Sequence, residues 1–151
     1  MLHKAIEQFL HDVFWDAPEY LFVDMPPGTG DIAISMAQFL PRAQVLVVTT
    51  PQPTAQRVAR RAALMAQQVD QEVIGVVENM SWFTGDDGKR YELFGAGGGE
   101  ALAGELGVPL MAQIPLVPAM REGADQGRPV SLAAPDSEAA AAFQQLAEAV
   151  E

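Results

Sequence analysis

Continuous apolar runs alternate along the chain with segments of helical periodicity. Four such runs predict strands buried on both faces, as in a parallel sheet: residues 20–23, 44–50, 73–79 and 110–114. Helical spacing of apolar residues predicts helices over residues 2–14, 32–40, 54–69 and 136–150, with another that carries Leu102 and Leu106. Strand followed by helix, four times over, predicts right-handed crossovers. The expected fold is therefore α/β, a three-layer, mostly parallel sheet with helices on both faces.

The long helix over residues 54–69 has one apolar stripe and one basic side. Thr54 is expected to cap it, and the spacing of Val58, Ala62, Met65 and Val69 predicts that these residues face the core. Three arginines, Arg57, Arg60 and Arg61, lie off that stripe. We interpret them as a solvated face, with a partner contact as the alternative.

The stretches after residue 79 are rich in glycine and proline. Residues 80–91 have no helical period, which predicts an exposed excursion such as a hairpin. The run 97–99 looks like a phosphate cradle, but Glu100 stands where the dinucleotide fingerprint has Gly or Ala, so we interpret the run as a flexible or close-packed turn. Gly107 is expected to end the helix that follows, residues 118–122 to form one helical turn, and residues 129–130 to be extended.

Composition narrows the class of protein. The 151 residues suit one domain, with 49% hydrophobic and 19% charged residues. A net charge of −11 argues against broad binding to nucleic acid, which needs Lys and Arg. The chain has no Cys, so an iron–sulfur cluster held by thiolates of this chain is not expected. No apolar run reaches the roughly 18 residues of a membrane span and no signal peptide is recognisable, which predicts a cytoplasmic protein without a membrane contact.

One stretch carries the first chemical signal. The run 20–23 predicts a buried strand, Asp24 follows it, and Gly28 and Gly30 leave backbone amides open to close approach. An acid at the end of such a strand can orient a water on Mg²⁺, which prefers oxygen ligands. A capping or turn aspartate is the alternative. Asp31 is expected to cap the next helix.

The second signal is Asn79, which ends the third predicted strand. Its amide offers a donor and an acceptor and could bind a base edge, while a turn-forming asparagine is the alternative.

Five segments in order make the chain similar to the Mrp (ApbC-like) family of ATP-binding iron–sulfur cluster carriers, within the MinD/ParA-like P-loop class. They are residues 23–31, 47–52, 75–81, 94–100 and 114–129. The likeness covers about residues 1–130, and residues 1–151 would form one α/β domain, the C-terminal part of the family's ATPase domain.

The resemblance implies a homodimer that sandwiches ATP and Mg²⁺ and serves iron–sulfur client proteins. Asp24 matches the Walker B acid near Mg²⁺. The segment Pro27-Gly28-Thr29-Gly30, with Asp31 after it, matches the switch that senses the γ-phosphate. Asn79 matches the base-reading asparagine, and Pro115 with Leu116 matches the loop that lines the base.

Two departures from the family pattern limit this expectation. The phosphate-binding loop, a Gly-rich stretch with Lys and Ser/Thr, is absent, so we expect weak or no ATP binding and no measurable hydrolysis by this chain. The Cys-x-x-Cys pair that many members carry after the asparagine is absent as well. The alternatives are a non-catalytic interaction module that kept the fold, or a MinD/ParA-type positioning ATPase. A missing central strand would expose a sheet edge and favour oligomers.

Overall fold

The computed structural model describes residues 2–26 and 30–151, without the side chains of residues 2, 30 and 31. Its main sheet has three parallel strands in the order β1 (Gln44–Thr49), β2 (Glu72–Asn79) and β5 (Leu110–Ile114). β2 lies in the centre, with Val45 beside Val73 on one side and Val77 beside Ala112 on the other. The aliphatic run of β2 is buried on both faces as predicted, since Val76 and Val77 are almost completely buried. The prediction was wrong in part for β1, where Val48 is 58% exposed because β1 lies at the edge of this three-stranded sheet.

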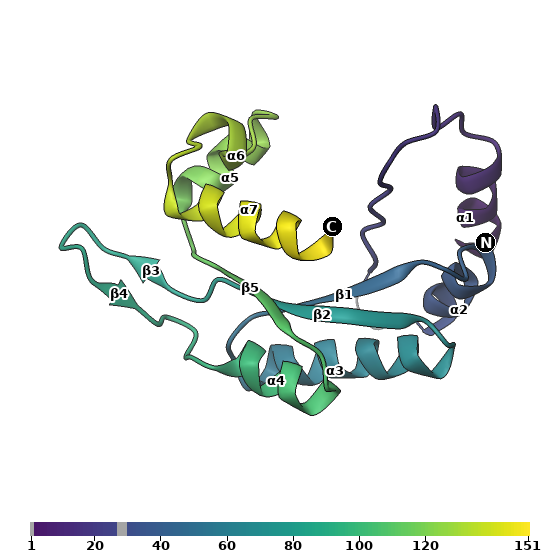
Figure 1. The fold of residues 1–151 in the computed structure, drawn as a ribbon, viewed down its shortest axis with the longest axis horizontal. Helices are drawn as coiled ribbons and strands as arrows, with labels where there is room; N and C mark the ends of the chain where they lie inside the picture. The colour runs from purple at the N-terminus through teal and green to yellow at the C-terminus, as the bar shows by residue number, and fades with distance from the viewer. Residues whose placement is uncertain (1, 27–29) are drawn as a thin grey trace.

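One face of the sheet is covered by α3 (Pro53–Gln68) and α4 (Gly98–Leu106), which Figure 1 shows side by side. Three alanines of α3, at positions 59, 63 and 66, are buried there against strand residues such as Val47 and Val76. The predicted stripe through Val58 was wrong, because that side chain is 48% exposed. Alanine lets the helix backbone approach the sheet closely, so the small residues and not the large ones face the core.

The opposite face is covered by α7 (Glu138–Val150), so the three-layer arrangement is as predicted (Figure 1). Leu146 of α7 packs against a buried cluster that includes Ala112 and Ile114 of β5. Two short helices precede it, α5 (Pro118–Asp125) and α6 (Val130–Ala133). α5 is longer than the single turn we expected, and residue 130 begins a helix instead of being extended.

Helix ends follow local chemistry. α3 begins after Gln52 with Pro53 in its first turn, so Thr54 is not its cap; proline suits that place because its missing N–H has no partner there anyway. α4 ends at Gly107, which has a φ of 69° and serves as the predicted C-cap. Ser137 caps α7 by accepting a hydrogen bond from the amide of Ala140.

The N-terminal segment forms its own layer against α2 (Gly30–Phe39). α1 (Leu2–His11) packs on α2 through the His3 ring, which lies over Phe39 at 4.9 Å and shares a hydrogen bond of 2.8 Å with the Ser35 hydroxyl. Within the described residues, no helix is both long enough and apolar enough to cross a membrane.

The first predicted strand, residues 20–23, is not a strand in the structure. Phe22 is 80% exposed and Tyr20 is 52% exposed, so this run is not buried either. A strand needs a hydrogen-bonded neighbour, and in the described part of the chain β1 pairs only with β2. The prediction of a buried strand here was wrong, because the segment has no strand neighbour among the described residues.

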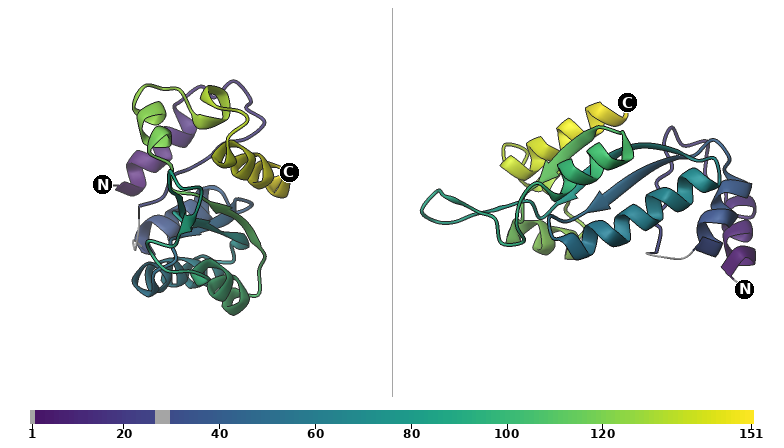
Figure 2. Two further views of the ribbon diagram at one scale, coloured as in Figure 1. Left: turned by 90° about the vertical axis from the view of Figure 1, so that its left-hand side faces the viewer. Right: turned by 90° about the horizontal axis from the view of Figure 1, so that it is seen from below.

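The excursion after β2 is an antiparallel hairpin, as predicted. β3 (Phe83–Thr84) pairs with β4 (Arg90–Tyr91), and the hairpin extends beyond the end of the main sheet in Figures 1 and 2.

Candidate functional site

The ends of β2 and β5 bring three of the predicted site residues to one place. Asn79 is the last residue of β2 and lies in register with Ile114, the last residue of β5. Pro115 follows at once and is almost completely buried, and Leu116 comes next. The two strand exits are tied together, because the Ser81 amide donates to the Ile114 carbonyl at 3.0 Å.

A second backbone bond continues this link beyond the strands. The Leu116 amide donates to the Trp82 carbonyl at 2.7 Å, so the loop after β5 runs beside the loop after β2. Asn79 and Leu116, which are partly exposed, therefore lie at neighbouring positions at the carboxyl edge of the sheet, where open α/β folds bind ligands, while Pro115 is buried.

The Asn79 side chain has a structural role that leaves part of it available. Its Oδ1 accepts a hydrogen bond of 2.9 Å from the Met80 amide. This bond stabilises a turn in which Met80 has a φ of 56°. The Nδ2 group makes no hydrogen bond with the described residues, so it remains a donor for a ligand.

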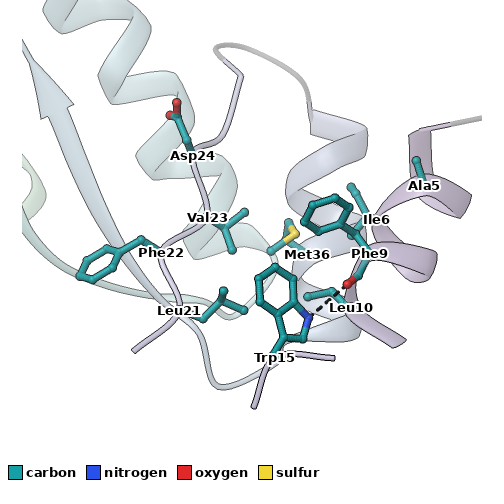
Figure 3. A pocket seen from close by; sticks show the side chains of 10 residues that line it. All are labelled: Ala5, Ile6, Phe9, Leu10, Trp15, Leu21, Phe22, Val23, Asp24 and Met36. Carbon is teal, nitrogen blue, oxygen red and sulfur yellow. Dashed lines mark hydrogen bonds between the residues drawn. The ribbon is translucent and has the colours of Figure 1, made fainter. Parts of the chain in front are cut away.

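Asp24 lies elsewhere. Its side chain is exposed and borders a cavity of about 360 Å³ whose other walls are mostly apolar, with Phe9, Trp15, Leu21 and Met36 among them (Figure 3). Figure 3 shows the carboxylate directed away from these side chains. Because residues 20–23 are not in the sheet, Asp24 does not end a strand, and the expected delivery of this acid to the sheet edge was wrong.

The remaining predicted site residues belong to the segment that runs from Asp24 into the first turn of α2. Pro27, Gly28 and Thr29 lie outside the described residues. Gly30 is the first residue of α2, so Asp31 lies inside the first turn instead of preceding the helix as an N-cap.

The two predicted halves of the site do not share a cavity in the described part of the chain. The cavity beside Asp24 is lined by α1, α2 and the segment 15–24, and neither Asn79 nor Pro115 borders it. A single carboxylate is compatible with Mg²⁺, which binds few protein ligands and keeps several waters. Among the described residues, however, no group of three or more acidic or histidine side chains could hold a metal ion. The described residues thus bring Asn79, Pro115 and Leu116 together and leave Asp24 apart from them.

Sequence reasoning missed Glu78, whose carboxylate is almost completely buried at the end of β2. One oxygen accepts hydrogen bonds of 2.8 Å from both the Ser81 hydroxyl and the Gln113 side-chain amide. The other accepts from the backbone amide of Gly99 at 2.5 Å. One side chain thereby joins the ends of β2 and β5 to the start of α4.

Glu78 also explains the glycine run before α4. A helix N-terminus attracts an anion, and here the protein supplies its own carboxylate. A Cβ at position 99 would lie 2.6 Å from the Cβ of Glu78, and one at position 98 would overlap the carbonyl oxygen of Pro51. Close packing requires Gly98 and Gly99, which confirms that part of our interpretation of the run, whereas Gly97 has open space around it and is favoured by its φ of 73°. A signal was available in the sequence: an acid inside an otherwise aliphatic strand needs a buried partner.

The base of the hairpin is held by a set of polar contacts. The Arg90 guanidinium lies over the Trp82 ring, 4.2 Å from its centre, and forms an ion pair with Glu138 at the start of α7. The Thr84 hydroxyl donates to the same carboxylate at 3.3 Å. A second cavity, of about 180 Å³, is bordered by Glu78, Trp82 and Arg90.

The tip of the hairpin is ordered by Asp87. Its carboxylate accepts hydrogen bonds from the Lys89 amide at 3.1 Å and from the Tyr91 hydroxyl at 2.9 Å. These bonds stabilise the ionised form, the Lys89 amide most and then the Tyr91 hydroxyl, and hold the pKa of Asp87 below its ordinary value of 3.8. The same contact with Asp87 raises the pKa of Tyr91 above 10.0.

Comparison with known proteins places this architecture in a family. A family model described as ParA: NUBPL iron-transfer P-loop NTPase matches residues 1–151. The chain belongs to this family of P-loop NTPases. An iron–sulfur cluster carrier protein of Mycobacterium leprae is 52% identical over 143 residues, which cover 91% of this chain and 37% of the relative. One from Synechocystis is 45% identical over 152 residues, covering 99% of this chain and 43% of the relative.

Solved structures of P-loop NTPases support the same fold. A nucleotide-binding protein from Archaeoglobus fulgidus in complex with ADP matches 84% of this chain and 53% of that protein, with a TM-score of 0.72 and 34% identity. The septum site-determining protein MinD from Pyrococcus horikoshii, complexed with Mg-ADP, matches 78% of this chain and 44% of that protein, with a TM-score of 0.61 and 26% identity.

The chain is shorter than its relatives. It spans between 33% and 51% of the length of the curated iron–sulfur cluster carriers compared here.

Proposed function

We propose that residues 1–151 are one α/β unit, the C-terminal part of an Mrp-like ATP-binding domain that serves the carriage of iron–sulfur clusters. The observation that supports this most is the joining of Asn79 to the Pro115–Leu116 loop at neighbouring strand ends. The carrier relatives and the neighbour solved in complex with ADP support a nucleotide-linked role in cluster carriage.

In this proposal each site residue has a separate task. The free Nδ2 of Asn79 donates to an acceptor on the base edge, and Pro115 with Leu116 forms the apolar wall against the ring. In the whole protein, Asp24 orients a water on Mg²⁺, which would neutralise charge on the phosphates. Gly28, Thr29 and Gly30 sense the γ-phosphate, and Asp31 completes that segment.

We propose further that this chain alone binds ATP weakly and does not hydrolyse it measurably. Its sequence contains no Gly-rich loop followed by Lys and Ser/Thr, which is the part of such sites that holds the β- and γ-phosphates. A base contact without a phosphate grip supports dissociation constants on the order of 1 mM or weaker.

The cluster itself is cargo in this proposal. Because the chain has no Cys, it offers no thiolate to a cluster, and its contribution is the nucleotide-linked part of the carrier. The resemblance to Mrp proteins favours a homodimer as the working form and iron–sulfur client proteins as partners.

The test is an NMR titration of the ¹⁵N-labelled chain with Mg-ATP up to about 10 mM, a range suited to millimolar binding. We expect shifts of the amides of Asn79, Met80 and Leu116 that saturate together, and we expect the Asn79→Ala variant to lose them. The matched variant is Asn79→Asp, which keeps an acceptor for the Met80 amide but removes the Nδ2 donor; it should keep the turn and still lose the shifts.

Two results would contradict the proposal. Micromolar affinity measured by calorimetry would refute the weak-binding part. Shifts that spread over the surface, or that persist unchanged in both variants, would refute the base site and favour the non-catalytic interaction module.

A further inference from the structure

The outer face of α3 combines two arginines with exposed aliphatic side chains. Arg57 and Arg61 lie one turn apart, and Val58 and Leu64 beside them are 48% and 37% exposed. The buried alanines 59, 63 and 66 are on the opposite side of the helix. We call the four residues Arg57, Val58, Arg61 and Leu64 the α3 face.

The charge of this face is opposite to that of the chain. The chain has 20 acidic residues and a net charge of −11, yet the sequence of α3 contains no Asp or Glu. Neighbouring Arg60 is neutralised by an ion pair with Glu105 of α4. Arg57 and Arg61 form no ion pair or hydrogen bond with the described residues.

This arrangement does not stabilise the helix. Like charges at positions i and i+4 of a helix repel each other and destabilise it slightly. Two exposed aliphatic side chains next to them gain nothing from contact with water. Packing and intramolecular electrostatics therefore leave the α3 face unexplained.

We propose that the α3 face docks an acidic segment of a partner protein, one that presents carboxylates to Arg57 and Arg61 and an apolar side chain to Val58 and Leu64. Arginine suits this task because its planar guanidinium binds a carboxylate through two parallel hydrogen bonds. Arginine and apolar anchors together are also what protein interfaces are enriched in.

Charge complementarity favours an acidic peptide segment over nucleic acids and anionic membranes as the ligand of the α3 face. Nucleic acids and anionic membranes are bound through many cations, and 4–8 clustered Lys or Arg are typical of lipid surfaces. The α3 face offers only two arginines, and the chain has a net charge of −11, so most of the molecule would repel a long polyanion. A short acidic segment needs only the local positive charge of Arg57 and Arg61.

The docking site is separate from the nucleotide site. α3 lies on the side face of the sheet together with α4, whereas Asn79 and Pro115 lie at the ends of the strands (Figure 1). The proposal therefore stands if the nucleotide assignment fails, and its experiment needs no nucleotide.

The experiment uses fluorescence anisotropy with a fluorescein-labelled 12-residue peptide made of glutamate and leucine in helical spacing. The double variant Arg57→Gln/Arg61→Gln should bind it about tenfold more weakly than the unmodified chain. The matched control, Arg42→Gln/Arg128→Gln, removes the same charge from exposed positions elsewhere and should change the affinity less than about twofold. Leu64→Gln should weaken binding while leaving its salt dependence unchanged.

Circular dichroism provides the check on folding, since removing a repulsive pair should leave the helix intact. Equal weakening by the double variant and its control would overturn the proposal, because net charge alone would then explain binding. It would also be overturned if a single-stranded oligonucleotide or vesicles of anionic lipid bound through Arg57 and Arg61 more tightly than the peptide does.

Discussion

Glu78 offers the sharpest test of how this chain is held together. Replacing it with alanine removes the buried carboxylate that accepts from Ser81, Gln113 and Gly99. The Ser81 hydroxyl retains a partner, because it also donates to the Glu78 backbone carbonyl at 2.9 Å. Gln113 is exposed and can turn to water. The Gly99 amide has neither option, since it is buried at the start of α4.

The expected loss follows from these differences. An orphaned buried amide costs about 1–3 kcal/mol. The methylene groups of Glu78 contribute about 0.8 kcal/mol each through burial. We therefore expect Glu78→Ala to lower the free energy of unfolding by about 3–4 kcal/mol. Glu78→Gln keeps the volume but directs an amide donor at either Gly99 or Gln113, and should cost about 2 kcal/mol.

Urea unfolding followed by circular dichroism measures both losses. With a slope of about 2 kcal/mol per molar urea, Glu78→Gln should lower the midpoint by about 1 M. The control is Glu72→Gln at the exposed start of the same strand. Among the described residues this carboxylate accepts a hydrogen bond from the Gln44 side chain alone, so the change should cost less than about 0.5 kcal/mol. If the free energy of unfolding of Glu78→Ala lies within about 0.5 kcal/mol of that of the unmodified chain, the hydrogen bonds of Glu78 do not hold these elements together.

Three further predictions concern other parts of the chain. Gly98→Ala should destabilise the chain by about 1–3 kcal/mol, because the new Cβ would overlap a backbone oxygen. Gly104→Ala in the same helix meets open space and should stabilise the chain by about 0.5–1 kcal/mol. The urea midpoint should therefore fall in the first variant and rise in the second. Tyr91→Phe should raise the pKa of Asp87 toward 3.8 in a ¹³C NMR titration, because the Lys89 amide would remain as its main donor. Since the pKa of Asp87 is lowered by folding, its contribution to stability is present above pH 3.8 and is lost as the pH falls through the folded value; an unchanged titration in the variant would show that the hydroxyl contact is not made. Anaerobic reconstitution with iron and sulfide should leave no visible absorbance from a bound cluster, and a stable cluster on this Cys-free chain would contradict our account of the cargo.

Three of the four predicted strands formed, because each continuous aliphatic run has a parallel neighbour with which to pair. The fourth, residues 20–23, has the same kind of pattern and yet is exposed. A pattern reports what a segment prefers, while a strand also requires a neighbour, and pairing over long separations is not written in local sequence. The same limit explains α3, where Ala59 and Ala63 face the sheet although larger residues suggested another stripe.

The candidate site was predictable where a polar residue follows a strand. Asn79 and the pair Pro115–Leu116 could be placed at the sheet edge from strand order alone. An aliphatic strand that contains Glu78 signals a buried partner for that acid, but the partners could not be named from the sequence, because they come from three segments that meet only in the folded chain. The expected position of Asp24 failed with the strand that was to carry it.

The spacing of the strand partners has a consequence for how the chain folds. Val45 pairs with Val73 and Val77 with Ala112, so each contact in the main sheet closes a loop of about thirty residues, while Phe83 and Tyr91 of the hairpin are close neighbours in sequence. Loop closure must precede the gain from such distant contacts, which makes parallel sheets slow to form. The hairpin and the helices should thus acquire structure first, and the sheet should assemble last, around β2.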